Sequence, residues 1–215
     1  MPGRRRSSTR RYRRFKRAYR KGGVYGVAKQ AAKSIVKYYL NPEYKFLDSS
    51  ITTPFSFGFT GVLQSTPTLI GQGDADTQRN GNSVKVTSML TRGTIELADT
   101  NAAQCRFIIF TDTSSNGAPP AVTDLLQSAS VISPLNRING KRFRVLYDRS
   151  WVLDADNPKK QIHIFKKMQH HIHYLDSTAN TSSLGQGPIY FLWISDQNTN
   201  APLATWNNRF RFLDN

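Results

Sequence analysis

The sequence predicts an all-β domain of eight antiparallel strands, preceded by a basic arm and one amphipathic helix. From residue 42 onward, β-branched and aromatic runs alternate with clusters of Gly, Pro, Asn, Asp and Ser, as in strands joined by turns. Helical spacing nearly disappears there, and strands do not alternate with helices as in a parallel sheet. The charge is uneven. Residues 1–45 carry 15 Lys and Arg against one acid, net +14, whereas residues 46–215 carry 15 against 13, net +2.

The first element is a basic arm over residues 1–23. Eleven of residues 4–21 are Lys or Arg and none is acidic. Such a block repels itself and stays extended until a polyanion neutralises it, which is typical of nucleic-acid-binding arms. Interleaved aromatic rings can stack on unpaired bases or contact other protein. The candidate nucleic-acid-binding residues of the arm are Arg4, Arg5, Arg6, Arg10, Arg11, Tyr12, Arg13, Arg14, Phe15, Lys16, Arg17, Tyr19, Arg20 and Lys21.

The arm also resembles targeting segments. Its stretch RRYRRFKR has the composition of a nuclear localisation signal. A mitochondrial presequence is likewise rich in Arg and Ser, although the arginines are packed more densely here than in an amphipathic presequence. A secretory signal would need an apolar run after the charges, and none follows. No run of the chain reaches the length of a transmembrane span.

Residues 24–41 are predicted to form a basic amphipathic helix that ends at Asn41, because the residue before a proline is pushed out of the helical region. The apolar positions, spaced by three and four, are Val24, Val27, Ala31, Ile35 and Tyr38. The further candidate nucleic-acid contacts, at i, i+4 spacing on another face, are Lys29, Lys33 and Lys37. Three roles remain open: docking on the body, bridging phosphates and neighbouring subunits, and lying on a membrane surface.

Residues 42–215 form the β domain. The expected strands are 54–64, 83–98 with a bend near Gly93, 104–112, 142–148, 150–154, 161–175, 188–196 and 205–213. A short helix is expected at 123–127, with Thr123 as its cap, inside the longest connection. Eight antiparallel strands in a domain of this size suggest a two-sheet sandwich of the jelly-roll type.

Alternation along the strands predicts which residues face the core. Phe143, Val145 and Tyr147 share one face of their strand, opposite Arg142, Arg144 and Leu146. In the last strand, Phe210 and Phe212 oppose Arg209 and Arg211. The arginine faces are therefore expected at solvent, at a subunit contact or against nucleic acid. Trp193 and the single cysteine, Cys105, lie in apolar runs and are expected in the core; a lone cysteine suits a reducing compartment.

Neither a metal site nor a catalytic site is predicted. His163, His170, His171 and His173 cluster in one strand, but no Cys or second cluster accompanies them; strand or interface histidines, including a pH-sensitive contact, explain them better than zinc ligands. Asp74 and Asp76, with Asn80 and Asn82 nearby, could offer calcium oxygen ligands, yet the spacing is not that of an EF-hand and a turn is expected. Nucleophile-elbow, phosphate-loop, zincin and dinucleotide motifs are absent.

Five stretches in this order resemble a known family. They are QRNG at 78–81, RFIIFTD at 106–112, RFRVLYD at 142–148, GPIYFLWISD at 187–196 and RFRFLDN at 209–215. Together with the basic arm, they resemble a small single jelly-roll viral capsid protein. They are similar to the satellite tobacco necrosis virus-like capsids of plant satellite viruses, and to those of circular Rep-encoding single-stranded DNA viruses.

The resemblance implies a coat protein that is not an enzyme and that forms an icosahedral homo-oligomer of about sixty copies. It implies an arm that points inward to a viral genome, expected to be single-stranded DNA. A DNA genome replicating in the host nucleus would require a nuclear import receptor as a partner, and the product would reside in the virion. No cofactor is expected, although calcium at subunit contacts occurs in some relatives. The alternatives are a cellular nucleic-acid-binding protein with a basic tail and a jelly-roll ligand-binding module; the first would spread its charge over the body, and the second would be secreted.

Overall fold

The computed structural model describes residues 26, 28–32, 34–35 and 43–214. The chain divides into two compact units, residues 1–42 and residues 43–215. All of the described strands lie in the second unit. Among the residues described, no helix has the length and apolar character that crossing a membrane requires.

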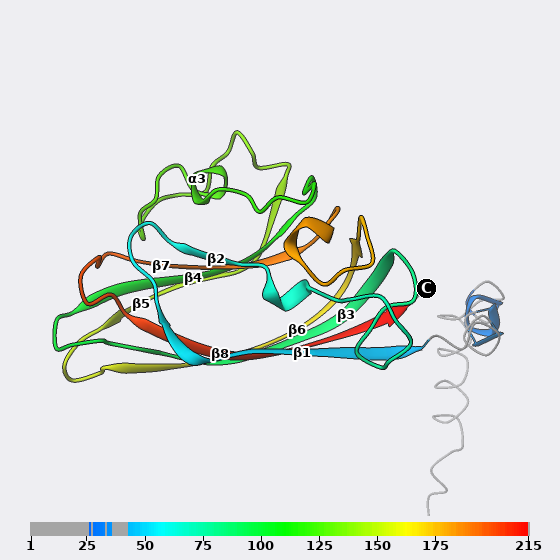
Figure 1. Ribbon diagram of the computed structural model, residues 1–215, viewed down its shortest axis with the longest axis horizontal. Helices are drawn as coiled ribbons and strands as arrows, with labels where there is room; N and C mark the ends of the chain where they lie inside the picture. Colours follow the sequence, from blue (N-terminus) through cyan, green and yellow to red (C-terminus); the bar gives the residue numbers. More distant parts are fainter. Residues whose placement is uncertain (1–25, 27, 33, 36–42, 215) are drawn as a thin grey trace, which may run out of the picture. The chain divides into compact units, whose positions relative to one another are not determined.

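Eight antiparallel strands build the second unit (Figure 1). They are β1 (Tyr44–Ser56), β2 (Val62–Gln64), β3 (Ser83–Glu96), β4 (Ala103–Asp112), β5 (Phe143–Leu153), β6 (Lys159–His173), β7 (Ile189–Ser195) and β8 (Leu203–Asp214). One sheet has the order β1-β8-β3-β6 and the other the order β2-β7-β4-β5. The chain changes sheet at nearly every step, so the predicted eight-stranded jelly-roll sandwich is confirmed.

Five of the predicted strands coincide with β3, β4, β6, β7 and β8 to within two residues. The prediction of a strand over 54–64 was wrong, because β1 ends at Ser56 and β2 begins only at Val62. The first ten residues of β1, residues 44–53, were missed. Their pattern is inverted, since Tyr44 and Phe46 are exposed while Lys45 is buried, and this hides the alternation that identifies a strand.

The expected break between 142–148 and 150–154 was also wrong, because both belong to the single strand β5. Arg149, which lies at the expected break, and the neighbouring Ser150 pair in register with Phe107 and Arg106 of β4. Two adjacent polar residues are tolerated there because β5 is the last strand of its sheet and pairs only on one side.

Gly93 does not interrupt the register of β3 with β6 and β8. The irregularity lies between Val86 and Ser88. A Cβ atom at Gly93 would lie 2.6 Å from the Thr205 carbonyl oxygen, so the glycine allows β8 to approach closely rather than bending the strand.

The core lies between the two sheets. Every residue of β7 is buried, and the Trp193 side chain is fully buried and stacks on Phe107 with ring centroids 3.8 Å apart. Trp206 is buried beside it and its Nε1 donates to the Gln64 side chain at 2.7 Å. Cys105 is buried, and burial raises the pKa of its thiol to about 12, which leaves it unreactive. The core positions expected for Trp193 and Cys105 are confirmed.

The long connection between β4 and β5 lies over the outward side of the sheet β2-β7-β4-β5 (Figure 1). It contains α3 (Val122–Leu125), which begins one residue and ends two residues earlier than expected. Ala121 precedes the helix in place of the expected cap Thr123, and its N–H is held by the Asp124 carboxylate at 2.9 Å. Two short 3₁₀ helices, η1 (Thr66–Thr68) and η2 (Thr181–Ser183), complete the unit.

Candidate nucleic-acid interface

Most of the residues predicted to bind nucleic acid lie outside the described residues. These are all the candidates from Arg4 to Lys21, together with Lys33 and Lys37. Lys29 is described, and it lies exposed on helical backbone. The backbone is helical at residues 26, 28–32 and 34–35, as expected, and Ala31 and Ile35 of the expected apolar stripe are exposed.

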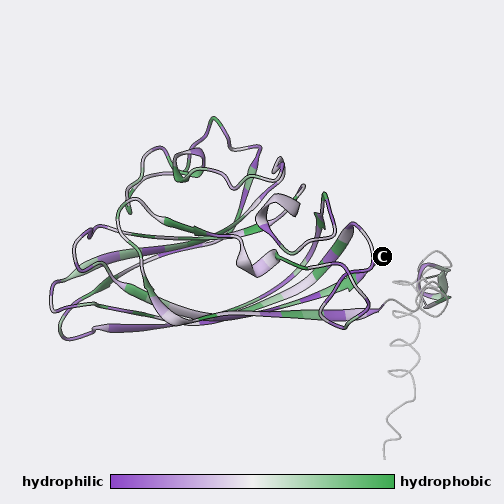
Figure 2. Cartoon of the chain, in the orientation of Figure 1, coloured by the Kyte–Doolittle hydropathy of each residue, from purple (hydrophilic) through white to green (hydrophobic). Residues whose placement is uncertain are grey.

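The sheet β1-β8-β3-β6 presents an outward side whose residues line up in rows across the strands. Because side chains alternate along a strand, register partners share one face of the sheet. The three central rows are Phe46–Arg211–Ser88–Lys167, Asp48–Arg209–Leu90–Phe165 and Ser50–Asn207–Arg92–His163. The alternate residues of β8, among them Phe210 and Phe212, are buried in the core, so the predicted alternation of Phe and Arg in this strand is confirmed. Figure 2 shows hydrophilic and hydrophobic residues following one another along the strands.

We call this outward side the basic face. Its cations are Lys85, Arg92, Lys159, Lys167, Arg209 and Arg211. Its acids are Asp48 and Glu96, and its histidines are His163, His171 and His173. Six cations against two acids give a net charge of +4 before any histidine is protonated. Since residues 46–215 carry only +2 in total, the rest of that segment is negative on balance, and the positive charge is concentrated on one sheet.

Two of the six cations are neutralised on the face itself. Arg209 donates two hydrogen bonds of 2.6 Å to the Asp48 carboxylate, and these lower the pKa of that carboxyl. Lys159 lies 2.7 Å from Glu96. Within the described part of the chain, no ion pair involves the other four cations, Lys85, Arg92, Lys167 and Arg211.

Three aromatic side chains lie among these cations. Tyr44 is 66%, Phe165 55% and Phe46 38% exposed. The Arg209 guanidinium lies 5.2 Å from the centre of the Phe46 ring, which is the geometry of a cation–π contact. Exposed apolar side chains indicate a binding surface when they gather in one patch, and these three line the same hollow.

Sequence reasoning found Arg209 and Arg211 but missed Lys85, Arg92 and Lys167. A signal existed in the alternation of Val84, Lys85 and Val86. This alternation does not continue along β3 and β6, because the register shifts between Val86 and Ser88 of β3 and between Lys167 and His170 of β6. Only the register shows that these cations share a face with Arg211.

The outward arginines of the other sheet are used within the fold. Arg106 forms a bidentate pair with Asp148 at 2.6 and 2.8 Å and also donates to the Ser133 carbonyl, which holds the covering connection in place. Arg142 forms a bidentate pair with the fully buried Asp112 at 2.8 and 2.9 Å. The expectation that Arg142 belongs to a free arginine face was therefore wrong, whereas Arg144 is exposed as expected.

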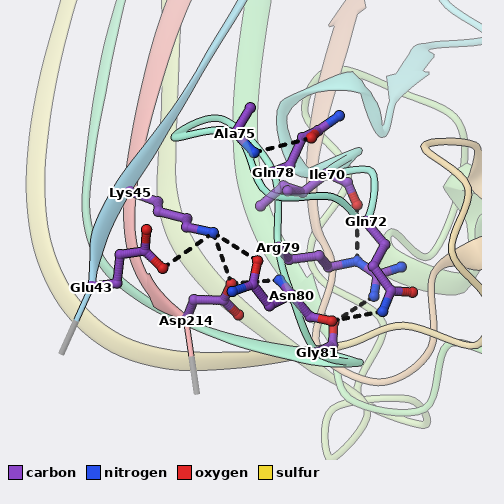
Figure 3. A network of polar contacts seen from close by, with 10 residues as sticks. All are labelled: Glu43, Lys45, Ile70, Gln72, Ala75, Gln78, Arg79, Asn80, Gly81 and Asp214. Carbon is purple, nitrogen blue, oxygen red and sulfur yellow. Dashed lines mark hydrogen bonds and ion pairs between the residues drawn. The ribbon is translucent and has the colours of Figure 1, made fainter. Parts of the chain in front are cut away.

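The start of β1 is fixed by a buried lysine (Figure 3). Lys45 of β1 is 2% exposed, and its Nζ lies 3.2 Å from Asp214, 3.3 Å from Glu43 and 3.0 Å from the Asn80 side-chain oxygen. Burial opposes the charged amine, but the hydrogen bonds to Asp214 and Glu43 outweigh it and raise the pKa of Lys45. The residues after Pro42 are thereby tied to the last strand at one end of the basic face.

Beside this lysine, Arg79 is fully buried and organises the loop between β2 and β3 (Figure 3). Its guanidinium donates to the carbonyls of Ile70, Gly81 and Asp176 and lies 4.1 Å from the centre of the Tyr174 ring. Burial lowers the pKa of Arg79. The arginine of the QRNG stretch therefore acts within the fold and is not available to a ligand.

The histidines divide between the two sides of β6. His171 and His173 are exposed on the basic face, whereas His170 points the other way, is half-buried and donates from Nε2 to the Gly187 carbonyl at 2.6 Å. Among the described residues, no group of three His, Cys, Asp or Glu side chains is placed to hold a metal ion. Asp74 and Asp76 lie exposed in the loop between β2 and β3, as expected for a turn.

Comparison with known proteins agrees with this architecture. Residues 15–215 match the satellite tobacco necrosis virus coat protein family. The coat protein of Maize white line mosaic satellite virus is 28% identical over 96% of this chain and 97% of its own length. The capsid protein of Satellite tobacco necrosis virus 1 is 32% identical over 63% of this chain and 70% of its own length, and the coat protein of Satellite tobacco necrosis virus 2 is 29% identical over 86% and 92%. Because the family match spans nearly the whole chain, this protein belongs to the satellite tobacco necrosis virus coat protein family.

Proposed function

We propose that this coat protein assembles into a closed virion shell and packages a single-stranded genome through its basic arm, residues 1–23. The observation that carries the proposal is the separation of charge, with +14 on residues 1–45 and +2 on the remainder. A nearly neutral body can pack against its own copies without strong repulsion, while the arms gather their charge on a polyanion. The resemblance implies about sixty copies in a closed icosahedral arrangement.

Counterion release supplies the driving force. Each phosphate neutralised by Lys or Arg releases a bound cation into solution, and this favours binding with little dependence on base sequence. Arginine predominates in the arm because its forked donors match phosphate oxygens. Many arms on one shell make the binding multivalent, so that weak individual contacts add to strong retention.

The single-stranded character of the cargo is supported by Tyr12, Phe15 and Tyr19. Their rings lie between the cations in sequence, and an aromatic ring can stack on an unpaired base but not on one already stacked within a duplex. In the following helix, Lys29 is exposed, and Lys33 and Lys37 would extend the same row of charges along one face.

The cargo is proposed to be DNA, with the RRYRRFKR stretch engaging a nuclear import receptor of the host before assembly. This part of the proposal rests on the likeness to coat proteins of single-stranded DNA viruses and on the composition of the stretch. The relatives matched above are named only as coat or capsid proteins of satellite viruses.

Purified particles test the proposal. Negative-stain microscopy should show uniform closed shells, and dispersed monomers or trimers would contradict the assembly. The nucleic acid extracted from the shells should be degraded by a nuclease specific for single-stranded DNA and should resist ribonuclease. Degradation by ribonuclease alone would overturn the DNA assignment and leave the arm's role intact, whereas shells without nucleic acid would overturn packaging itself.

A further inference from the structure

We infer that the basic face is a second binding site for single-stranded nucleic acid, built by the folded domain and separate from the arm. The inference deepens the proposed packaging function and rests on it. Its starting point is that four cations of the face, Lys85, Arg92, Lys167 and Arg211, have no carboxylate partner among the described residues. Like charges held on one face repel one another, and a bound polyanion removes that repulsion.

The shape of the face suits a nucleotide chain. A hollow of ≈ 510 Å³ is lined by Tyr44, Phe46, Phe165, Lys167, Arg209 and Arg211. A second of ≈ 440 Å³ shares Arg209 with it, and a third of ≈ 400 Å³ shares Arg92 and Asn207 with the second. The three hollows are therefore neighbours along the sheet, and a chain of several nucleotides would follow them.

The first hollow combines the two contacts that an unpaired nucleotide requires. Arg211 and Lys167 are register partners of Ser88 on either side of β3, so that they lie about two strand spacings apart, roughly 10 Å. The half-exposed Phe165 ring lies in the next row beside Leu90. A base stacked on Phe165 would place its flanking phosphates near the two cations. A duplex buries the faces of its bases and cannot make this contact.

The other outward side of the sandwich does not offer such a site. Its Arg106 and Arg142 are paired with Asp148 and Asp112, and the connection containing α3 covers part of it. The domain does provide a matched control away from the basic face, because Lys141, Arg144 and Arg149 are exposed in or next to the edge strand β5 and take part in no ion pair within the described residues.

The first test compares two charge variants of the full chain. One carries Arg92→Gln, Lys167→Gln and Arg211→Gln, and the control carries Lys141→Gln, Arg144→Gln and Arg149→Gln. Affinity for a labelled deoxythymidine oligonucleotide is measured over a range of salt concentrations, after circular dichroism has shown that both variants keep the parent's fold. The face variant should lower the log–log salt slope by about 2, from roughly 0.7 for each lost phosphate contact. The control should leave the slope unchanged, and equal slopes for the face variant, the control and the parent would overturn the inference.

The second test separates stacking from charge with Phe165→Leu, which keeps an apolar side chain. Its affinity for the deoxythymidine oligonucleotide should fall by about fivefold or more, because stacking on an aromatic ring contributes roughly 1–3 kcal/mol per base. Its affinity for an abasic oligonucleotide of the same length should not change. An equal effect on both probes, or no effect on either, would show that Phe165 does not stack on a base.

Photocrosslinking in assembled particles then locates the contact without any substitution. Crosslinked peptides from β6 or β8 would support binding at the basic face, whereas crosslinks confined to residues 1–42 would overturn it.

The experiments distinguish a failure of this inference from a failure of the proposed role of the arm. Loss of the face site leaves the arm's contribution to the salt slope in place, and loss of the arm's role leaves the crosslinks to β6 and β8.

Discussion

The two buried cations, Arg79 and Lys45, show that charge in this chain serves two purposes. Both are enclosed by carbonyl and carboxylate oxygens in the described structure, and both hold together segments that are distant in sequence. The cations of the basic face have the opposite surroundings, since most of them are exposed and four form no ion pair with any residue that the structure describes. The buried cations and the cations of the basic face are the same types of residue. They differ in their burial and in the oxygen atoms that they contact.

Arg79 should be a determinant of stability. The substitution Arg79→Met keeps much of the volume but leaves the carbonyls of Ile70, Gly81 and Asp176 without their donors. We expect the free energy of unfolding, measured by urea denaturation of the unassembled chain, to fall by roughly 3 kcal/mol. Arg79→Lys, which keeps the charge but not the forked geometry, should cost less. Unchanged stability in the Met variant would contradict the assigned role.

His170 should make the fold sensitive to acid. Burial lowers the pKa of its ring below the ordinary 6.5; the hydrogen bond to Gly187 opposes this shift, and the charges of Arg144 and His171 add to it. The unfolded chain therefore binds a proton at higher pH than the folded chain does. The free energy of unfolding should decrease as the pH falls from about 6.5 towards the folded-state pKa, and this contribution should not vary with pH above that window.

Urea denaturation at about pH 7.5 and about pH 5.5 measures this effect. In His170→Gln, whose amide can still donate to the Gly187 carbonyl, the loss of stability between the two pH values should be smaller than in the parent. An equal loss in both proteins would assign the acid sensitivity to other groups.

At the scale of the elements, β3 and β8 depend on a close approach at Gly93. A Cβ there would lie 2.6 Å from the Thr205 carbonyl oxygen, which forces the two backbones apart. We expect Gly93→Ala to destabilise the domain by about 2 kcal/mol, as overpacking usually does. Gly71→Ala is the matched control, because the nearest atom to its new Cβ would be 3.5 Å away. Equal melting temperatures for the two variants would show that the sheet can absorb the added methyl group.

The elements also show how far the sequence predicts this fold. Strands with two different faces, such as β8, or with no exposed face, such as β7, follow from periodicity and apolar content. β1 was largely missed because the buried residue near its start, Lys45, is charged. Lys45 is buried because it pairs with Asp214, which is distant in the sequence but adjacent in the fold. A contact across that sequence distance leaves no local pattern.

The candidate site was less predictable than the strands. Arg209 and Arg211 could be assigned to an outward face from one strand alone. Lys85, Arg92 and Lys167 join them only through the register of three strands, and the irregularity at Val86 and Ser88 hides that register from the sequence. A surface that several strands share is thus harder to predict than any of its strands.

At the scale of the whole molecule, the distribution of charge is the feature that connects structure to function. The chain carries +16, of which +14 lies in residues 1–45. The folded unit is nearly neutral, and its own excess is concentrated on the sheet β1-β8-β3-β6. Residues 1–42, which include the arm, precede Glu43 and β1 of the same sheet in the chain. Positive charge is thus concentrated in two parts of the chain, residues 1–45 and the basic face.

The most direct measurement is the salt dependence of single-stranded nucleic-acid binding after deletion of residues 1–21, which removes eleven positive charges. A full-length variant with the same eleven residues changed to Gln keeps the arm's length and serves as the control. All described strands lie beyond the deletion, so the circular dichroism of the β domain should persist. If half of the eleven cations contact phosphates, the log–log salt slope should fall by about 4 in both variants. The same affinity and slope as the parent would contradict the claim that the arm binds the genome.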